Sequence, residues 1–136
     1  MPSAVIAITG ASGSQYSVRL IEALVDADWD IFLTVTREGA INLKLECDIT
    51  PRELAEKHGI RLEQNQNLAA KSASGSARFD AYVICPASGT TIGKIAAGIS
   101  DNLATRSAIV AMKERRKLII VPRAVSYTHL RAHETN

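Results

Sequence analysis

Residues 5–19 read VIAITGASGSQYSVR, a short apolar run that passes through a glycine turn into a segment of helical character. Gly10 and Gly13 allow the backbone to come close to a ligand, and Ser12 adds a hydroxyl. The first N–H groups of a helix lack intrahelical acceptors and carry a partial positive charge, so this stretch indicates an anion site. A glycine turn used only for tight packing is the alternative, because Gly-x-x-Gly is shorter than the full dinucleotide fingerprint.

Composition describes an ordinary globular chain of one-domain length. Its 136 residues are 46% hydrophobic and 22% charged, with a net charge of +2. So small a positive excess argues against nucleic acid or an anionic membrane surface as the main partner. The N-terminal apolar stretch, residues 4–8, is far shorter than the roughly 18 apolar residues of a membrane span. Cys47 and Cys85 have neither metal-binding spacing nor a paired framework, so we expect reduced packing thiols in a cytoplasmic protein.

Short β-rich runs alternate with helical segments, which is typical of a parallel sheet. The expected strands are 4–9, 31–36, 81–85 and 118–121, and the expected helices are 13–28, 38–45, 51–58, 92–98 and 103–114. Between Glu63 and Phe79 the chain is polar and aperiodic, which predicts a loop of the kind that often carries function. The pattern predicts an α/β fold with a parallel sheet that is covered on both faces.

Polar residues follow three of the expected strands. The GASG turn follows the first strand, Thr36 the second, and SGTT at 88–91 the third. In an open parallel sheet the carboxyl ends of neighbouring strands line one crevice. We call these three polar segments the polar corners and expect them to bind one ligand together. Helix capping is the alternative function of Ser88, Thr90 and Thr91, and it is compatible with ligand binding because both use the same helix start.

The last expected helix combines two cations with an apolar face. Arg106 and Lys113 are seven residues apart and point nearly the same way, with Ile109 and Val110 between them. One interpretation is a pair of long side chains whose stems cover the core. The other is a partly desolvated phosphate site, in which Arg binds two oxygens and Lys acts as a point charge.

Four motifs, in order along the chain, resemble the flavin prenyltransferase family of the UbiX type. They are ITGASGSQYSVRL at 8–20, LECD at 45–48, ASGSARFDAYVICPAS at 73–88 and DNLATRSAIVAMKERRKLIIVPR at 101–123. The resemblance implies a Rossmann-like, flavodoxin-type fold with helices on both faces of the sheet. It also implies bound FMN and transfer of a dimethylallyl group from dimethylallyl phosphate to reduced FMN, without a metal ion. The product, prenylated FMN, is the cofactor of a UbiD-type decarboxylase. Whether it would serve ubiquinone-type biosynthesis or another decarboxylation is left open.

The resemblance also implies roles for individual residues. The FMN contacts that it implies are Gly10, Ala11, Ser12, Thr36, Ser88, Gly89, Thr90, Thr91 and Arg123. Arg106 and Lys113 match positions that hold the prenyl phosphate, where fixed cations would stabilise the charge of the leaving group. Glu46 matches an acidic residue beside the flavin ring, which could manage the proton that leaves during ring closure, with Ser12 nearby. For Glu46 the alternative is an exposed carboxylate at a helix end.

The chain departs from the family after Arg123, where Ala124 replaces a glutamate and the expected continuation, with a further strand and helix, does not follow. We expect residues 1–124 to form an incomplete FMN-binding domain and residues 125–136 to be a foreign, disordered tail. His129 and His133 in that tail have a spacing of four, but we expect no metal site there. The family implies a homo-oligomer, a dodecamer, which a shortened chain with an open sheet edge is expected to form less well.

Two alternative functions stay open. The chain could be an FMN-binding module whose transferase site is incomplete. It could also be a relative of the flavin-dependent cysteine decarboxylases. Those enzymes depend on an active-site histidine, and His58, the only histidine before the tail, lies near an expected helix end where a surface role is favoured.

Overall fold

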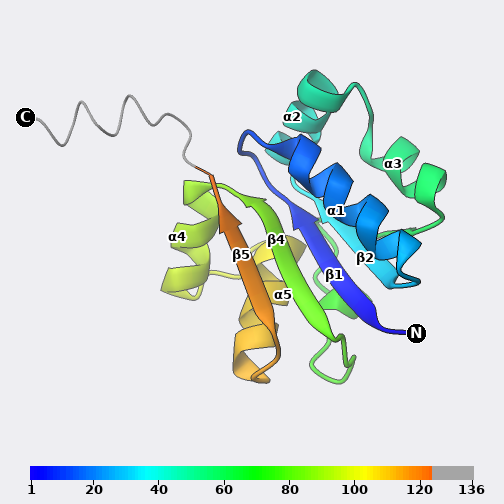
Figure 1. The fold of residues 1–136 in the computed structure, drawn as a ribbon. Helices are drawn as coiled ribbons and strands as arrows, with labels where there is room; N and C mark the ends of the chain where they lie inside the picture. Colours follow the sequence, from blue (N-terminus) through cyan, green and yellow to red (C-terminus); the bar gives the residue numbers. More distant parts are fainter. Residues whose placement is uncertain (124–136) are drawn as a thin grey trace, which may run out of the picture.

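One parallel five-stranded sheet carries the fold, in the order β3-β2-β1-β4-β5 (Figure 1). The computed structural model describes residues 1–123. The expectations for Ala124, for the tail and for its histidines therefore lie outside the described residues. The strands are β1 (Ser3–Ile8), β2 (Asp30–Val35), β3 (Arg61–Leu62), β4 (Ala81–Ala87) and β5 (Leu118–Pro122).

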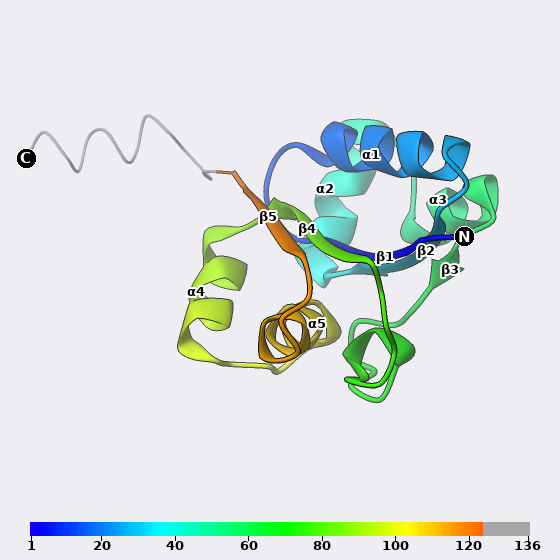
Figure 2. The same ribbon diagram turned by 60° about the horizontal axis from the view of Figure 1, so that its bottom comes forward.

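Helices cover both faces of the sheet. They are α1 (Ser14–Asp26), α2 (Arg37–Cys47), α3 (Pro51–His58), α4 (Gly89–Ala97) and α5 (Leu103–Lys113), with a short 3₁₀ turn, η1 (Lys71–Ala73). Figure 2 shows α1, α2 and α3 on one side of the sheet and α4, α5 and the loop with η1 on the other. The α/β fold class predicted from the alternation of strands and helices is confirmed. Within residues 1–123, no helix has the length and apolar character needed to cross a membrane.

The central strand is sandwiched between two apolar layers. Residues 4–8 of β1 are all 0% exposed, as expected for a strand covered on both faces. On one face Ile6 packs in the cluster that contains Ile21 of α1 and Leu43 of α2. On the other face Ala7 packs in the cluster that contains Ala104 and Ala108 of α5. This burial fixes the position of the carboxyl ends of the strands.

The predicted elements agree with the structure except at a few ends. The helix expected from residue 92 begins at Gly89, because Ser88 caps it, and β4 runs two residues beyond Cys85. The two-residue edge strand β3 was not predicted, since Arg61 and Leu62 are too few to show a period. It lies at the start of the polar stretch, whose remainder is a loop with η1, as predicted.

The strand order places a switch point beside β1. It pairs in parallel with β2 on one side and with β4 on the other. The chain crosses over one face to reach β2 and over the opposite face to reach β5, so the connections diverge at β1 and β4. In open α/β sheets, ligands bind in the crevice at the carboxyl ends of strands at such a point.

Candidate functional site

The carboxyl ends of β1, β2 and β4 open into one cleft of about 460 Å³. Its lining residues are Gly10, Thr36, Glu38, Ser88, Gly89, Thr90, Thr91, Lys94 and Asn102. The structure therefore brings the three polar corners together, in the arrangement that the strand ends predicted.

Thr9, at the end of β1, ties two of these corners together. Its buried hydroxyl donates to the Pro86 carbonyl at 2.7 Å and accepts from the Ser88 N–H at 2.8 Å. The bridge positions the start of α4 against the turn after β1. Sequence reasoning missed Thr9, although a hydroxyl that directly follows an apolar run was a usable signal.

Gly10 is required by close packing at the start of α2. A Cβ atom added to Gly10 would stand 2.4 Å from the Cβ of Glu38, closer than real contacts allow. Thr36 caps α2, since its Oγ1 accepts from the Gly39 N–H at 3.0 Å. Gly10 therefore serves tight packing, as the alternative interpretation of the turn proposed. Because Gly10 lets the turn approach α2 closely, it also forms one wall of the cleft.

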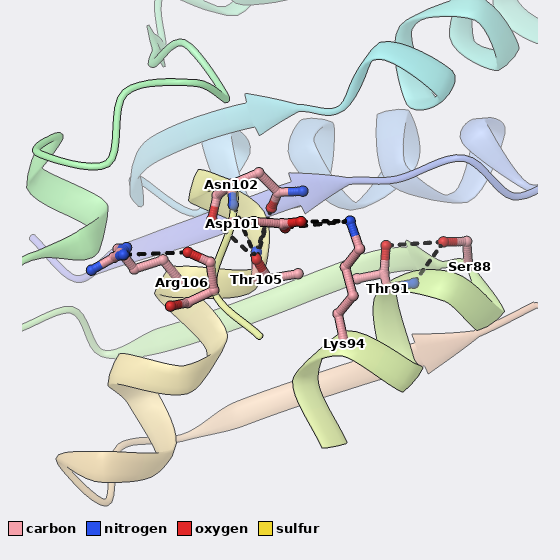
Figure 3. Close-up of polar contacts among 8 residues, drawn as sticks. Ser88, Thr91, Lys94, Asp101, Asn102, Thr105 and Arg106 are labelled. Carbon is pink, nitrogen blue, oxygen red and sulfur yellow. Dashed lines mark hydrogen bonds and ion pairs between the residues drawn. The ribbon is translucent and has the colours of Figure 1, made fainter. Parts of the chain in front are cut away.

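The start of α4 is open to a ligand. Ser88 Oγ accepts from the Thr91 N–H at 3.2 Å and donates to Thr91 Oγ1 at 2.9 Å (Figure 3). The N–H groups of Gly89 and Thr90 have no acceptor among residues 1–123, and no atom lies within 4 Å of a Cβ built on Gly89. Free N–H donors at a helix start and unobstructed space beside them suit an anion.

The start of α1 is already occupied by a carboxylate of the chain itself. Glu46, in the last turn of α2, accepts from the Ser14 N–H at 2.9 Å and from the Gly13 N–H at 3.2 Å. Partial burial raises the pKa of Glu46, but these donors and the nearby Arg123 outweigh it and hold the pKa below the ordinary value of 4.5. In the structure, the Glu46 carboxylate thus accepts from N–H groups at this helix start, and the FMN contacts expected at the GASG turn stay predictions.

Polar residues also gather around Glu46 at the start of α1. Arg123 donates its backbone N–H to the Ala87 carbonyl at 3.1 Å, and its guanidinium carbon lies 5.3 Å from the centre of the Tyr16 ring. The Ser14 hydroxyl is buried and makes no hydrogen bond with residues 1–123. The sequence analysis named Ser12 near Glu46 and did not name Ser14; the catalytic role of Ser12 stays a prediction.

Ser12 and Ala11 differ in their surroundings. Ser12 is exposed, whereas Ala11 is 2% exposed and donates its N–H to the Thr9 carbonyl at 2.9 Å. Neither residue lines the 460 Å³ cleft. Their roles as FMN contacts stay predictions.

The two cations of α5 do not lie at the cleft. Lys113, the last residue of α5, is exposed, and Arg106 is half-buried with its NH2 group 3.3 Å from the Ser100 carbonyl. Neither lines the cleft, and Figure 3 shows the Arg106 side chain pointing away from Lys94 and Ser88. The role of this pair in holding the prenyl phosphate stays a prediction.

A second hollow of about 410 Å³ adjoins the cleft. Thr36, Glu38 and Asn102 line both hollows, so they form the boundary between them. Loop residues 63–66 supply much of the remaining wall. The predicted loop thus lines the second hollow. The sequence analysis did not identify Asn102, Lys94 or Glu38 as candidate site residues. A signal for Asn102 was present, since Asn102 and Thr105 have the spacing of a capping box.

The two cysteines and His58 lie outside both hollows. Burial raises the pKa of the Cys85 thiol, which lies in the core, and Cys47 packs against the same cluster. His58 ends α3 and lines neither hollow. In the part of the chain that the structure describes, no group of three or more His, Cys, Asp or Glu side chains could hold a metal ion.

Comparison with known proteins agrees with this fold. The family model for flavoproteins matches residues 2–134. The flavin prenyltransferase UbiX of Thermoplasma acidophilum is 42% identical over 119 residues, which cover 88% of this chain and 64% of that protein. The chain therefore spans about two thirds of the length of such relatives.

Two solved structures share the fold closely. The crystal structure of AnUbiX (PadA1) in complex with FMN and dimethylallyl pyrophosphate is 31% identical, with a TM-score of 0.87 over 96% of this chain and 70% of that chain. A dodecameric FMN-dependent UbiX-like decarboxylase from Escherichia coli O157:H7 is 31% identical, with a TM-score of 0.86 over 97% of this chain and 73% of that chain. The chain belongs to the flavoprotein family and, within it, to the flavin prenyltransferases.

Proposed function

We propose that this chain binds FMN in the cleft at the ends of β1, β2 and β4 and that it acts as a flavin prenyltransferase. The observation that carries the proposal is the convergence of Gly10, Thr36 and residues 88–91 on one cleft. Membership of the flavin prenyltransferases supports it, because relatives with the same fold carry that name.

The described residues fit a flavin mononucleotide. The open N–H groups of Gly89 and Thr90, with the hydroxyls around them, would hold the phosphate at the start of α4. The start of α1 is less suitable for the phosphate, because the Glu46 carboxylate already takes its N–H groups and would repel a second anion. The phosphate end of FMN therefore belongs to α4 in this proposal.

Glu46 is the candidate proton acceptor. Its carboxylate, held by the N–H groups of Gly13 and Ser14, would accept the proton that is lost when the new ring closes. Reduced FMN, when bound, would supply the nucleophilic N5 and C6 positions that receive the dimethylallyl group, while the allylic C–O bond of the donor breaks and its phosphate leaves. Ser14 and Arg123 would hold Glu46 in place for this step. Arg106 and Lys113 of α5, which do not line the cleft, would hold the phosphate of the prenyl donor, as the family resemblance implies.

The donor and the recipient belong to the same proposal. We expect dimethylallyl phosphate or the pyrophosphate as donor, since a relative was crystallised with dimethylallyl pyrophosphate. Prenylated FMN would pass to a UbiD-type decarboxylase, and a homo-oligomer is expected because a relative is dodecameric.

Anaerobic incubation of the protein with reduced FMN and each donor, followed by mass spectrometry of the flavin, tests the activity. A flavin mass increased by one prenyl unit supports the proposal. An unchanged mass with protein that has bound FMN rejects the transferase activity of this chain.

A binding module without activity is the second candidate, favoured by the observation that neither Arg106 nor Lys113 lines the cleft. Quenching of FMN fluorescence without product would favour it. No quenching would reject both candidates.

A further inference from the structure

Asn102 presents a side-chain donor whose orientation is fixed by the start of α5. Its Oδ1 accepts from the Thr105 N–H at 2.8 Å and contacts Thr105 Oγ1 at 3.0 Å. A backbone N–H can only donate, so the atom facing Thr105 must be the oxygen of the amide. The Nδ2 group therefore points the other way, as Figure 3 shows.

This donor lies at the boundary of the two hollows. Asn102 lines both of them, and its Nδ2 has no hydrogen-bond acceptor among residues 1–123. A flip of the amide would place NH2 against the Thr105 N–H and lose the cap. The amide nitrogen is thus free and held in one direction.

Neighbouring contacts keep Asn102 in place. Asn65, in the loop after β3, accepts from the Leu103 N–H with its backbone carbonyl at 2.8 Å and from the Ala104 N–H with its Oδ1 at 3.0 Å. Asp101, beside Asn102, is paired with Lys94 of α4 at 3.1 Å. The start of α5 is therefore held by both the loop and α4, and a donor held in this way loses little freedom when a ligand binds.

We propose that Asn102 is an FMN-binding residue, whose Nδ2 donates a hydrogen bond to an oxygen of the bound flavin mononucleotide. This inference rests on the proposed FMN site. FMN offers acceptors along its whole length, in the phosphate, the ribityl hydroxyls and the ring carbonyls. Asn102 has two functions in this proposal: Oδ1 caps α5, and Nδ2 binds the ligand.

Asn102→Ser separates the two functions. Serine caps a helix about as well as asparagine but lacks the amide nitrogen. We expect the affinity for FMN, measured by quenching of flavin fluorescence, to fall roughly tenfold, the value of one hydrogen bond. The melting temperature without ligand should stay close to that of the wild type.

Asn67→Ser is the matched control. Asn67 also accepts a backbone N–H through Oδ1, from Ala69 at 3.0 Å, but it is exposed and lines neither hollow. Its affinity for FMN should equal that of the wild type. If Asn102→Ser fails to fold, Asn102→Thr replaces it, because threonine also caps a helix start, has no amide nitrogen and adds no charge.

Riboflavin, which lacks the phosphate, locates the acceptor. An equal loss with FMN and riboflavin supports a ribityl or ring oxygen, and a loss with FMN alone supports a phosphate oxygen. Wild-type affinity for FMN in either folded Asn102 variant overturns the inference. If the wild type itself does not bind FMN, the proposed function fails instead, so the two failures are distinguishable.

Discussion

Glu46 Oε1 lies 2.9 Å from the backbone nitrogen of Ser14, so a side chain from the end of α2 caps the first turn of α1. Gly13, the residue before that helix, provides no side-chain cap of its own and has a φ of 112°, which glycine adopts readily. The contact therefore joins the end of α2 to the start of α1.

Glu46→Gln should destabilise the protein at pH 7 by a few tenths of a kcal/mol, because an exposed charge at a helix start contributes little after solvent screening. The pKa of Glu46 is lowered in the folded protein, so its contribution is present above pH 4.5 and is lost as the pH falls through the folded pKa. Urea unfolding at pH 7 and at pH 3 should show the difference at pH 7 only. Glu56→Gln, on the exposed side of α3, should show no such difference; an equal deficit of the Glu46 variant at both pH values would contradict the prediction.

Thr9→Val should cost about 1–3 kcal/mol of unfolding free energy, because the Ser88 N–H loses its acceptor and the Pro86 carbonyl loses its donor. The affinity for FMN should fall as well, since Thr9 positions the start of α4. Thr9→Ser keeps the hydroxyl and serves as the control in urea unfolding and flavin titration. Equal stability of the valine and serine variants would show that the bridge is unimportant.

Gly89→Ala should leave the unfolding free energy of the ligand-free protein nearly unchanged, since nothing lies within 4 Å of the added Cβ. The affinity for FMN should fall at least tenfold if the phosphate occupies that space. Gly93→Ala is the matched control, because Gly93 lies one turn further along α4 and its added Cβ also meets nothing within 4 Å. Isothermal titration of both variants decides the question, and equal affinities would move the phosphate away from α4.

Lys113→Ala and Arg106→Ala test the cation pair of α5. From the geometry we expect both variants to bind FMN like the wild type, because neither side chain lines the cleft. Arg106→Ala should lower the melting temperature, since the half-buried stem of Arg106 packs against its surroundings. A selective rise of the KM for the prenyl donor in both variants would support the sequence hypothesis.

Local patterns in the chain were sufficient to predict most elements and the three polar corners. The apolar run at 4–8 required a strand covered on both faces, and Thr50 with Pro51 marked the start of α3. Strand ends of a parallel sheet share one edge, so the meeting of Thr36 and residues 88–91 followed from topology alone. The elements depend on residues that are close in sequence. The meeting of the polar corners depends on the shared edge of strand ends, which every parallel sheet of this kind has.

Contacts between distant residues were not predictable in this way. The sequence by itself determined the α/β fold, the order of its elements and the polar ends of its strands, because periodicity and turn chemistry are local properties. Only the tertiary structure decided that Glu46 caps α1 across 32 residues, that Thr9 bridges 77 residues to Pro86, and that Asn102 faces the cleft while Lys113 faces solvent. Those contacts depend on how the helices pack on the sheet. The packing sets where each side chain points and which distant residue it meets, and the sequence pattern alone does not distinguish these possibilities.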